Sequence, residues 1–217
     1  MVYQPPSFRR LVRRAAEYVV PHRILVSRVP AAGSRVALTF DDGPDPLTGT
    51  LLDRLDEVGI LATFFLVGRL CDERREAVLE IVRRGHEVAG HGYTHKRFPD
   101  MTADELRSEL RRTNDALPPS VARSFVRPPH GALHVPSLAH CAAQGFTTVM
   151  WSLDSRDANH RDAATVADNA GAARAGDIVL MHEGQQWTIE ALPEIARRVR
   201  ARGLDFCRVS DLLRPAG

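Results

Sequence analysis

The sequence predicts an α/β protein, a single distorted (β/α)7-type barrel related to the TIM barrel. From residue 35 onwards, short apolar runs typical of buried strands alternate with longer amphipathic runs typical of helices. Helical segments between successive strands favour parallel pairing with right-handed crossovers. The length of 217 residues also suits one domain, because α/β barrels run to roughly 200–250 residues or more.

The strands and helices are expected in alternation along the chain. We predict strands at residues 36–40, 61–67, 87–89, 124–126, 146–151, 178–181 and 204–209. We predict helices at residues 49–59, 72–84, 102–117, 136–144, 162–174 and 187–202. No shift in composition marks a linker, so residues 35–217 are expected to form one barrel domain, with residues 1–34 as an N-terminal extension packed on it.

Local signals support the individual boundaries. The first strand runs into Asp-Asp-Gly-Pro, a turn signal, and the strand at 124–126 is cut off by Pro128 and Pro129. Thr102 and Glu105 form a capping-box signature that opens the third helix. Three of the helices end at a glycine, namely Gly59, Gly85 and Gly145.

Composition excludes several classes of protein. Hydrophobic residues make up 44% of the chain and charged residues 26%, as in ordinary soluble globular proteins and unlike disordered or collagen-like ones. Lys and Arg number 29 against 27 Asp and Glu, a net charge of +2 with the signs mixed along the helices. This pattern indicates solvated helix faces and no nucleic-acid partner. The basic stretch at residues 9–14 is interpreted as a surface helix on the barrel, rather than a contact to a membrane or anionic polymer.

The cysteines and the N-terminal stretch bear on the cellular compartment. Cys71, Cys141 and Cys207 are too widely and irregularly spaced for a metal cluster or a disulfide framework, so we expect free, buried thiols, with one bridge and one free thiol as the alternative. The sequence contains no run of about 18 apolar residues, so we predict no transmembrane segment. No continuous apolar stretch precedes Pro21, which favours a cytoplasmic location, with the cell envelope as the alternative.

Polar side chains follow most of the predicted strands. In an α/β barrel, functional groups gather at the carboxyl ends of the strands. Residues from separate segments are therefore expected on one rim: Asp41 and Asp42, His91 and His95, Arg127, Asp154 and Asp157, and His182. His86 begins the strand that His91 follows, which places it roughly 16 Å away at the opposite end, as a structural or surface histidine.

Two histidines and an aspartate on this rim predict a metal site. His91 and His95 are four residues apart, which would place both imidazoles on one face of a helical turn. Alone this spacing is a weak signal, and Asp41-Asp42 alone is equally explained as a plain turn. A carboxylate from the neighbouring strand end completes three ligands and leaves positions open for water and substrate.

Arg127 and His182 are candidates for supporting chemistry. The two prolines after Arg127 fix its backbone, so its guanidinium is suited to orient a carboxylate base, with a rim-closing salt bridge as the alternative. A histidine has a pKa suited to protonating a leaving group near neutral pH. The alternative for His182 is a buried structural histidine.

These segments together resemble the polysaccharide deacetylases of carbohydrate esterase family four, which share the NodB homology domain. The similarity covers about residues 35–213. It is carried by five motifs in the family's order: Thr39 to Pro44 (T-F-D-D-G-P), His91 to His95 (H-[ST]-x-x-H), Arg127 to Gly131 (R-P-P-Y-G), Asp154 to Asp157 (D-x-x-D-W) and Leu180 to His182 (L-x-H).

The resemblance implies a role for each residue. Asp41 would be the general base and His182 the general acid, with Arg127 positioning Asp41 and Asp157 tuning His182. The implied metal ligands are Asp42, His91 and His95, for zinc first and for cobalt, nickel or manganese as alternatives. The implied substrate-binding residues are His130, Gly131, Leu180 and Trp151.

The chain departs from the family pattern at three positions. Gly92 replaces Ser or Thr and removes a hydroxyl that would support the histidine loop. His130 replaces Tyr, a position at which the family uses the backbone N–H, and not the side chain, to bind the oxyanion. Ala158 replaces the Trp that walls the acyl pocket, so the pocket is either wider or filled by Trp151 or Trp187.

Three functions follow as hypotheses. The first is a metal-dependent hydrolase that removes N-acetyl groups from N-acetylglucosamine-type units of a glycan, such as peptidoglycan, chitin oligosaccharide or exopolysaccharide. The second keeps the same site for deacylation or deformylation of a lipid-linked sugar or small amide. The third is a carbohydrate-binding protein without turnover, which the complete set of metal and catalytic residues disfavours.

Overall fold

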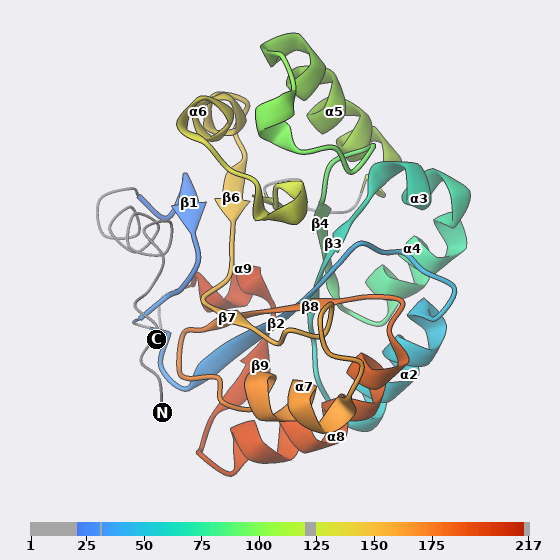
Figure 1. The fold of residues 1–217 in the computed structure, drawn as a ribbon, viewed down its shortest axis with the longest axis vertical. Coiled ribbons are helices and arrows are strands. Elements are labelled where there is room, and N and C mark those ends of the chain that lie inside the picture. The colour runs from blue at the N-terminus through green and yellow to red at the C-terminus, as the bar shows by residue number, and fades with distance from the viewer. Residues whose placement is uncertain (1–20, 31, 120–124, 215–217) are drawn as a thin grey trace.

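The computed structural model of this chain describes residues 21–30, 32–119 and 125–214 (Figure 1). The basic stretch at residues 9–14 and the first residue of the predicted strand 124–126 lie outside these residues. Figure 1 shows the strands in the middle of the molecule with helices arranged around them. The predicted distorted α/β barrel is therefore confirmed.

Within the described residues the sheet contains nine strands, in the order β1-β6-β5-β4-β3-β2-β8-β7 with β9 also paired to β2. Every strand pair in this sheet is parallel. The strands are β1 (Leu25–Val26), β2 (Arg35–Asp41), β3 (Thr63–Leu66), β4 (Glu87–Gly90), β5 (Phe125–Val126), β6 (Thr147–Val149), β7 (Leu153–Asp154), β8 (Ile178–His182) and β9 (Asp205–Cys207).

The helices fall close to the predicted segments. They are α2 (Thr48–Glu57), α3 (Gly68–Glu73), α4 (Arg75–Arg83), α5 (Ala103–Ala116), α6 (Val135–Ala143), α7 (Ala163–Ala170), α8 (Gln186–Arg200) and α9 (Val209–Leu212). Short 3₁₀ helices lie at Phe98–Asp100 and Pro129–Gly131. The predicted capping box is present at α5, where the side chain of Thr102 accepts from the N–H of Glu105 and the Glu105 side chain accepts in return.

Several predicted boundaries were wrong. The single helix expected at 72–84 is two helices, because Arg74, with φ −130° and ψ 50°, ends α3 and begins α4. The strand expected at 146–151 ends at Val149, and the chain pairs again only as β7. Strand β1, inside the predicted extension, and helix α9 were not expected. These elements are two to four residues long, too short to show periodicity.

The bend between β6 and β7 closes the barrel. β6 pairs with β1 and β5, while β7 pairs with β8 at the other end of the sheet. Across the bend, the N–H of Met150 donates to the carbonyl of Val26 (2.7 Å), and the N–H of Ser152 donates to that of Ile178 (3.0 Å). One stretch of chain therefore joins the two ends of the sheet, which explains the distortion of the barrel.

The alternation of side chains along β2 places the first aspartate inside the barrel. Leu38 and Phe40 belong to the larger core cluster beneath the helices, whereas Ala37 belongs to a second cluster that includes Phe65. Residues two apart on a strand share a face, so Asp41 lies on the same face as Ala37. In register, Asp41 lies opposite His182 of β8.

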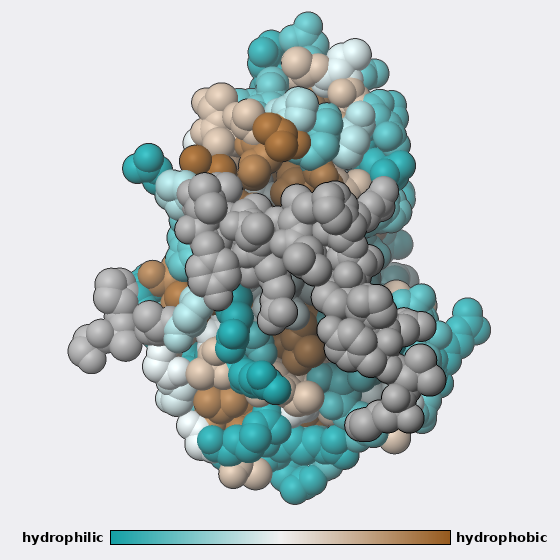
Figure 2. Space-filling view, turned by 60° about the vertical axis from the view of Figure 1, so that its left-hand side comes forward, coloured by the Kyte–Doolittle hydropathy of each residue, from teal (hydrophilic) through white to brown (hydrophobic). Residues whose placement is uncertain are grey.

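The surface of the described residues carries both hydrophilic and hydrophobic residues, in agreement with the mixed composition of the sequence. Figure 2 shows hydrophilic residues over the upper and lower ends of one face, with smaller hydrophobic groups between them. Helices long and apolar enough to cross a bilayer are absent from the described residues. Cys71, Cys141 and Cys207 are free thiols, as expected, and the first two are buried.

Candidate active site

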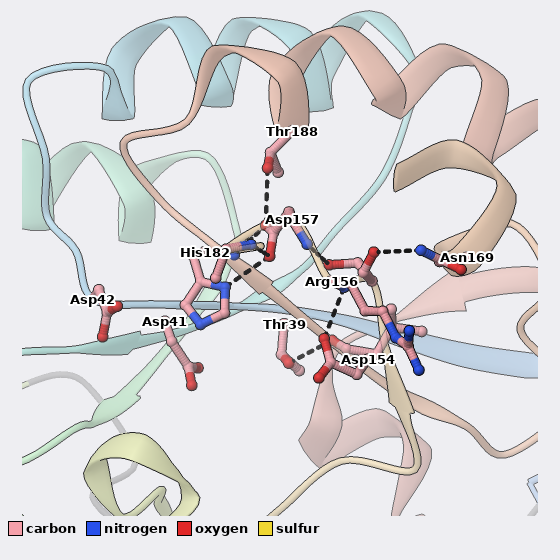
Figure 3. Close-up of polar contacts among 12 residues, drawn as sticks. Thr39, Asp41, Asp42, Asp154, Arg156, Asp157, Asn169, His182 and Thr188 are labelled. Atoms are coloured by element: carbon pink, nitrogen blue, oxygen red, sulfur yellow. Dashed lines mark hydrogen bonds and ion pairs between the residues drawn. The ribbon is translucent and has the colours of Figure 1, made fainter. Parts of the chain in front are cut away.

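The two adjacent aspartates at the end of β2 occupy different environments. Asp41 is buried. Asp42 has a φ of 73°, in the left-handed region that Asp tolerates better than most residues, and its side chain is 45% exposed. Figure 3 shows both aspartates beside the imidazole of His182. The turn at Asp42 therefore sends one carboxylate into the barrel and the other to its mouth.

Asp42 meets the two predicted histidine ligands. Oδ1 of Asp42 lies 3.0 Å from Nε2 of His95 and 3.3 Å from Nε2 of His91. One ligand atom from each of the three residues lies within 4.8 Å of the others. Nε2 of His95 is buried and faces Asp42 without the alignment of a hydrogen bond, as expected of a ligand atom aimed at a shared centre. This donor set therefore fits a divalent cation such as zinc.

The histidine segment was wrongly predicted as a helical turn. Residues 91–95 form a loop in which Gly92 and His95 have φ of 76° and 63°. The orientation of His91 comes from its other ring nitrogen, because Nδ1 lies 2.9 Å from the carbonyl of Arg127 and donates to it. This contact leaves Nε2 free to face Asp42, as second-shell bonds to metal-binding histidines commonly do.

The electrostatics of Asp42 match a ligand carboxylate. Burial alone would raise the pKa of Asp42, but the adjacent imidazoles of His91 and His95 outweigh burial and hold that pKa well below its ordinary value. The carboxylate is therefore ionised at neutral pH. An ionised carboxylate beside two imidazoles is the protonation pattern that metal binding requires.

Arg127 fills the interior of the barrel beneath the rim. Its side chain is fully buried and lies over the ring of Phe65, with the guanidinium carbon 3.9 Å from the ring centroid. Nη1 donates to Oδ1 of Asp41 (2.6 Å) and to Oγ1 of Thr39 (2.8 Å). Nε and Nη2 donate to the carbonyls of Val149 and Met150. The guanidinium thus holds Asp41 in one orientation, the geometry expected from the sequence.

His182 and Asp157 form a second coupled pair. Nδ1 of His182 lies 2.7 Å from Oδ1 of Asp157, whose Oδ2 accepts from the backbone N–H of His182 and from the hydroxyl of Thr188 (Figure 3). Burial on its own lowers the pKa of His182, but the bond to Asp157 outweighs it and raises the pKa to about 9. His182 is therefore an imidazolium at neutral pH, able to donate a proton from Nε2.

Asp41, the three candidate metal ligands and His182 open into one pocket of about 200 Å³. It is lined by Asp41, Asp42, His91, His95, His130, Gly131, Trp151, Asp154, Ala158, Asn159, Leu180 and His182. Arg127 and Asp157 lie behind this lining, each bonded to a residue in it. The structure thus brings together every site residue predicted from the sequence.

The family of the chain follows from comparison with known proteins. The sequence profile described as polysaccharide deacetylase matches residues 28–149, more than half of the chain. The chain belongs to the polysaccharide deacetylase family. Its members are hydrolases, and their metal dependence is consistent with the ligand set at Asp42.

Individual members of the family are similar over most of the chain. A peptidoglycan-N-acetylglucosamine deacetylase of Bacillus cereus is 31% identical over 84% of this chain and 70% of its own length. A chitooligosaccharide deacetylase of Rhizobium leguminosarum bv. trifolii is 38% identical over 75% of this chain and 80% of its own. The crystal structure of a peptidoglycan N-acetylglucosamine deacetylase superposes with a TM-score of 0.84 at 28% identity, covering 99% of both chains.

Ala158 stands where the family motif has tryptophan, and the structure shows which residues surround this part of the pocket. Trp151 lines the pocket with its ring against Gly131, where an added Cβ would lie 2.6 Å from the ring. Trp187 donates from Nε1 to the carbonyl of Asp157 (2.8 Å) but is not among the pocket-lining residues. Ala158 lines the pocket and is exposed. The wall at Ala158 is therefore open.

Sequence reasoning missed three polar residues around this deacetylase site. Thr188 donates to Asp157 from helix α8, and Asn159 lines the pocket next to Ala158. Glu109 of α5 is buried and accepts hydrogen bonds from the loop between His91 and His95. A signal for Glu109 was available, because it interrupts the apolar stripe that runs from Leu106 to Leu110.

Proposed function

We propose that this chain is a metal-dependent hydrolase that removes N-acetyl groups from N-acetylglucosamine-type units of a glycan. The observation that carries the proposal is the meeting of three elements in one pocket: the ligand set of Asp42, His91 and His95, a buried aspartate and an imidazolium. Similarity to deacetylases named for peptidoglycan N-acetylglucosamine and chitooligosaccharides supports the substrate class.

Asp42, His91 and His95 would hold the cation, with one carboxylate and two imidazole donors suited to zinc. When bound, such an ion supplies Lewis acidity, which polarises an amide carbonyl and makes water more acidic. Oδ2 of Asp41 lies 3.7 Å from Nε2 of His91, so the proposed base is next to the ligand set without belonging to it.

The residues of this chain then divide the proton transfers of amide hydrolysis. Asp41, held by Arg127, accepts a proton from the attacking water as the oxygen–carbon bond forms. His182, charged because of Asp157, gives a proton to the sugar nitrogen as the carbon–nitrogen bond breaks. The products are acetate and a free amine. One carboxylate that accepts a proton and one imidazolium that donates a proton, both lining the same pocket, are what this reaction requires.

The test is acetate release from N-acetylglucosamine oligomers, measured after chelation and again after addition of zinc or cobalt. Asp41→Asn is the matched variant, since it keeps the shape of the side chain and removes the base. We expect metal-restored release by the wild type and a loss of at least about 10²-fold in the variant. Thermal unfolding and metal affinity of Asp41→Asn serve as controls that the variant is folded and loaded.

Two results would contradict the proposal. One is absence of release from folded, metal-loaded protein with chitin oligomers, peptidoglycan and other acetylated sugars. The other is glycan binding that Asp41→Asn leaves unchanged, with turnover by neither form, which would support a carbohydrate-binding protein instead.

A second candidate function keeps the chemistry and changes the acyl group or its carrier. The observation that favours it is the open wall at Ala158. Glucosamine derivatives carrying formyl, acetyl, propionyl and butyryl groups would distinguish the candidates. A preference for acetyl supports the first, whereas a higher kcat/KM for formyl or for the longer groups supports deformylation or deacylation of a lipid-linked sugar or small amide.

A further inference from the structure

The loop between the two histidine ligands needs support from outside itself. Residues 91–95 form neither helix nor strand, so the position of His95 does not follow from regular backbone hydrogen bonds. On one side, the N–H groups of Gly68 and Arg69 in α3 donate to the carbonyls of Gly92 (2.9 Å) and Tyr93 (3.1 Å). These bonds satisfy the carbonyls of Gly92 and Tyr93, and the N–H groups of Tyr93 and Thr94 have a different partner.

That partner is Glu109 of helix α5. Its Oε1 accepts from the N–H of Tyr93 (2.8 Å), the N–H of Thr94 (2.5 Å) and the hydroxyl of Thr94 (2.8 Å). Glu109 is 6% exposed, so the carboxylate itself is largely shielded from water. Three hydrogen bonds to one carboxylate oxygen fix the two residues that immediately precede His95.

The charge of Glu109 has no cationic partner within the part of the chain that the structure describes. Its contacts there are with amide and hydroxyl donors, and it enters no ion pair with Arg, Lys or His. A buried carboxylate that lacks an ion pair is costly. A divalent cation held by His95, the residue after Thr94, would offset part of that cost.

Gly92 gives an independent reason for assigning the support of this loop to Glu109. Gly92 has a φ of 76°, and a Cβ at this position would lie 3.2 Å from Cγ of Pro129 and 3.4 Å from Oε1 of Glu109. The space that a side chain at position 92 would enter is thus bordered by the carboxylate that holds the loop. In this chain position 92 has no hydroxyl, and the loop is held by the carboxylate of Glu109 on α5.

We propose that Glu109 is a positioning residue that sets the affinity of the Asp42, His91 and His95 site for its metal, an inference that rests on the proposed function. It acts through Tyr93 and Thr94, by holding His95 where Nε2 faces Asp42. Residues that orient metal ligands in this way typically contribute 10–100-fold, as an order of magnitude, to metal affinity.

The experiment compares zinc and cobalt affinities of the wild type, Glu109→Gln and Glu109→Ala, measured by competition with a chromophoric chelator. Glu105→Gln is the matched control, because Glu105 lies one turn earlier on α5, is exposed, and accepts from Thr102 rather than from the loop. We expect the dissociation constant to rise about 10-fold in Glu109→Gln and towards 100-fold in Glu109→Ala. Glu105→Gln should bind as the wild type does.

Two further measurements separate positioning from general stability. The visible spectrum of the cobalt-loaded protein reports ligand geometry, and we expect it to change in Glu109→Gln but not in Glu105→Gln. Amide exchange at Thr94 should accelerate in the metal-free Glu109 variants. If Glu109→Ala does not fold, Glu109→Gln decides the question.

The outcomes distinguish this inference from the proposed function. Wild-type protein that binds metal, with folded Glu109→Gln of unchanged affinity and cobalt spectrum, overturns the role of Glu109 and leaves the hydrolase intact. Wild-type protein that binds neither zinc nor cobalt overturns both.

Discussion

Nη1 of Arg127 lies 2.6 Å from Oδ1 of Asp41, and both side chains are buried in the middle of the barrel. Asp41 ends β2 and Arg127 immediately follows β5, so the parallel strands place both residues at the same end of the barrel. Burial lowers the pKa of Arg127, and the adjacent carboxylate of Asp41 opposes that shift. Each of these two buried charges is therefore stabilised by the other.

Arg127→Gln is expected to impair both stability and turnover. The change leaves Asp41 as a buried carboxylate without its cation, and breaking a buried pair in this way costs about 3–5 kcal/mol. Urea denaturation of the metal-free protein measures this loss, and acetate release should fall by at least about 10²-fold. Arg127→Gln combined with Asp41→Asn should be more stable than Arg127→Gln alone, since it removes the unpaired charge. A single variant as stable as the wild type would show that the ion pair contributes little.

Asp157→Asn is expected to shift the alkaline limb of the pH profile. Asp157 raises the pKa of His182 to about 9, so the proposed acid keeps its proton through neutral pH and loses it as the pH rises past that value. Without the carboxylate the pKa of His182 falls, and the limb of kcat/KM should move to lower pH by more than about one unit. Asp154→Asn is the control, because Asp154 is on the same segment and accepts from the N–H of Arg156 instead. An alkaline limb at the same pH in Asp157→Asn and Asp154→Asn would contradict the assignment of Asp157 as the residue that raises the pKa of His182.

Ala158→Trp is expected to narrow the choice of acyl group. Ala158 forms the open wall of the pocket, so an indole there would restrict the space beside Leu180 and Trp151. We expect the ratio of kcat/KM for acetyl over butyryl glucosamine oligomers to rise about tenfold or more. A difference of one or two methylenes commonly changes kcat/KM by this amount when a pocket restricts the space. Ala158→Ser, which adds little volume, should keep the wild-type ratio. The same acetyl-to-butyryl ratio in the wild type and both variants would show that the acyl group does not lie beside position 158.

The sequence was sufficient to predict the barrel and the convergence of the candidate residues around one pocket. Alternation along β2 sets the face on which Asp41 lies, and parallel pairing brings the ends of β2 and β8 together. Because the polar residues follow strand ends, their convergence at one rim needed no knowledge of loop conformation. The prediction therefore succeeded where regular structure alone determines position.

The sequence did not predict the features that depend on contacts between distant segments. The loop at 91–95 is shaped by Glu109, 15 residues beyond Thr94, rather than by helical periodicity. Strand β7 has two residues and exists through its pairing with β8. Whether Trp151 or Trp187 lines the pocket depends on packing against Gly131 and on the bond to Asp157. Apart from the polar interruption that Glu109 makes in the apolar stripe of α5, local patterns carry no signal for such tertiary contacts.

His86 is expected to make the protein sensitive to acid. It is buried, its Nδ1 accepts from the N–H of Ala62 (3.1 Å), and its Nε2 has no partner in the described structure. Burial lowers the pKa of His86 to about 4, so the unfolded chain takes up this proton at higher pH than the folded one. Stability is therefore complete above the unfolded pKa of about 6.5 and is lost as the pH falls towards 4, by about 3 kcal/mol at pH 4.

His86→Gln is the variant that isolates this effect, because a glutamine oxygen can accept from Ala62 and does not titrate. Urea unfolding of both metal-free proteins between pH 8 and pH 4 should show a smaller decline in the variant, whatever its stability at pH 8. Parallel declines would exclude His86 as the source.

Glu183 should have the opposite dependence on pH. Its carboxyl lies against Gly43, where an added Cβ would be 1.6 Å from Oε1, and it accepts from the hydroxyl of Thr48. Burial, with Asp45 and Asp42 nearby, raises the pKa of Glu183 to about 8, so the folded protein retains a proton that the unfolded chain loses near its ordinary pKa. This contribution is complete below about pH 4.5 and is lost as the pH rises to 8, by about 4 kcal/mol as an upper value.

Glu183→Gln, a neutral isostere, should match the wild type near pH 5 and exceed its free energy of unfolding at pH 8. A stability difference that does not grow between these two values would mean that Glu183 is already ionised in the folded protein.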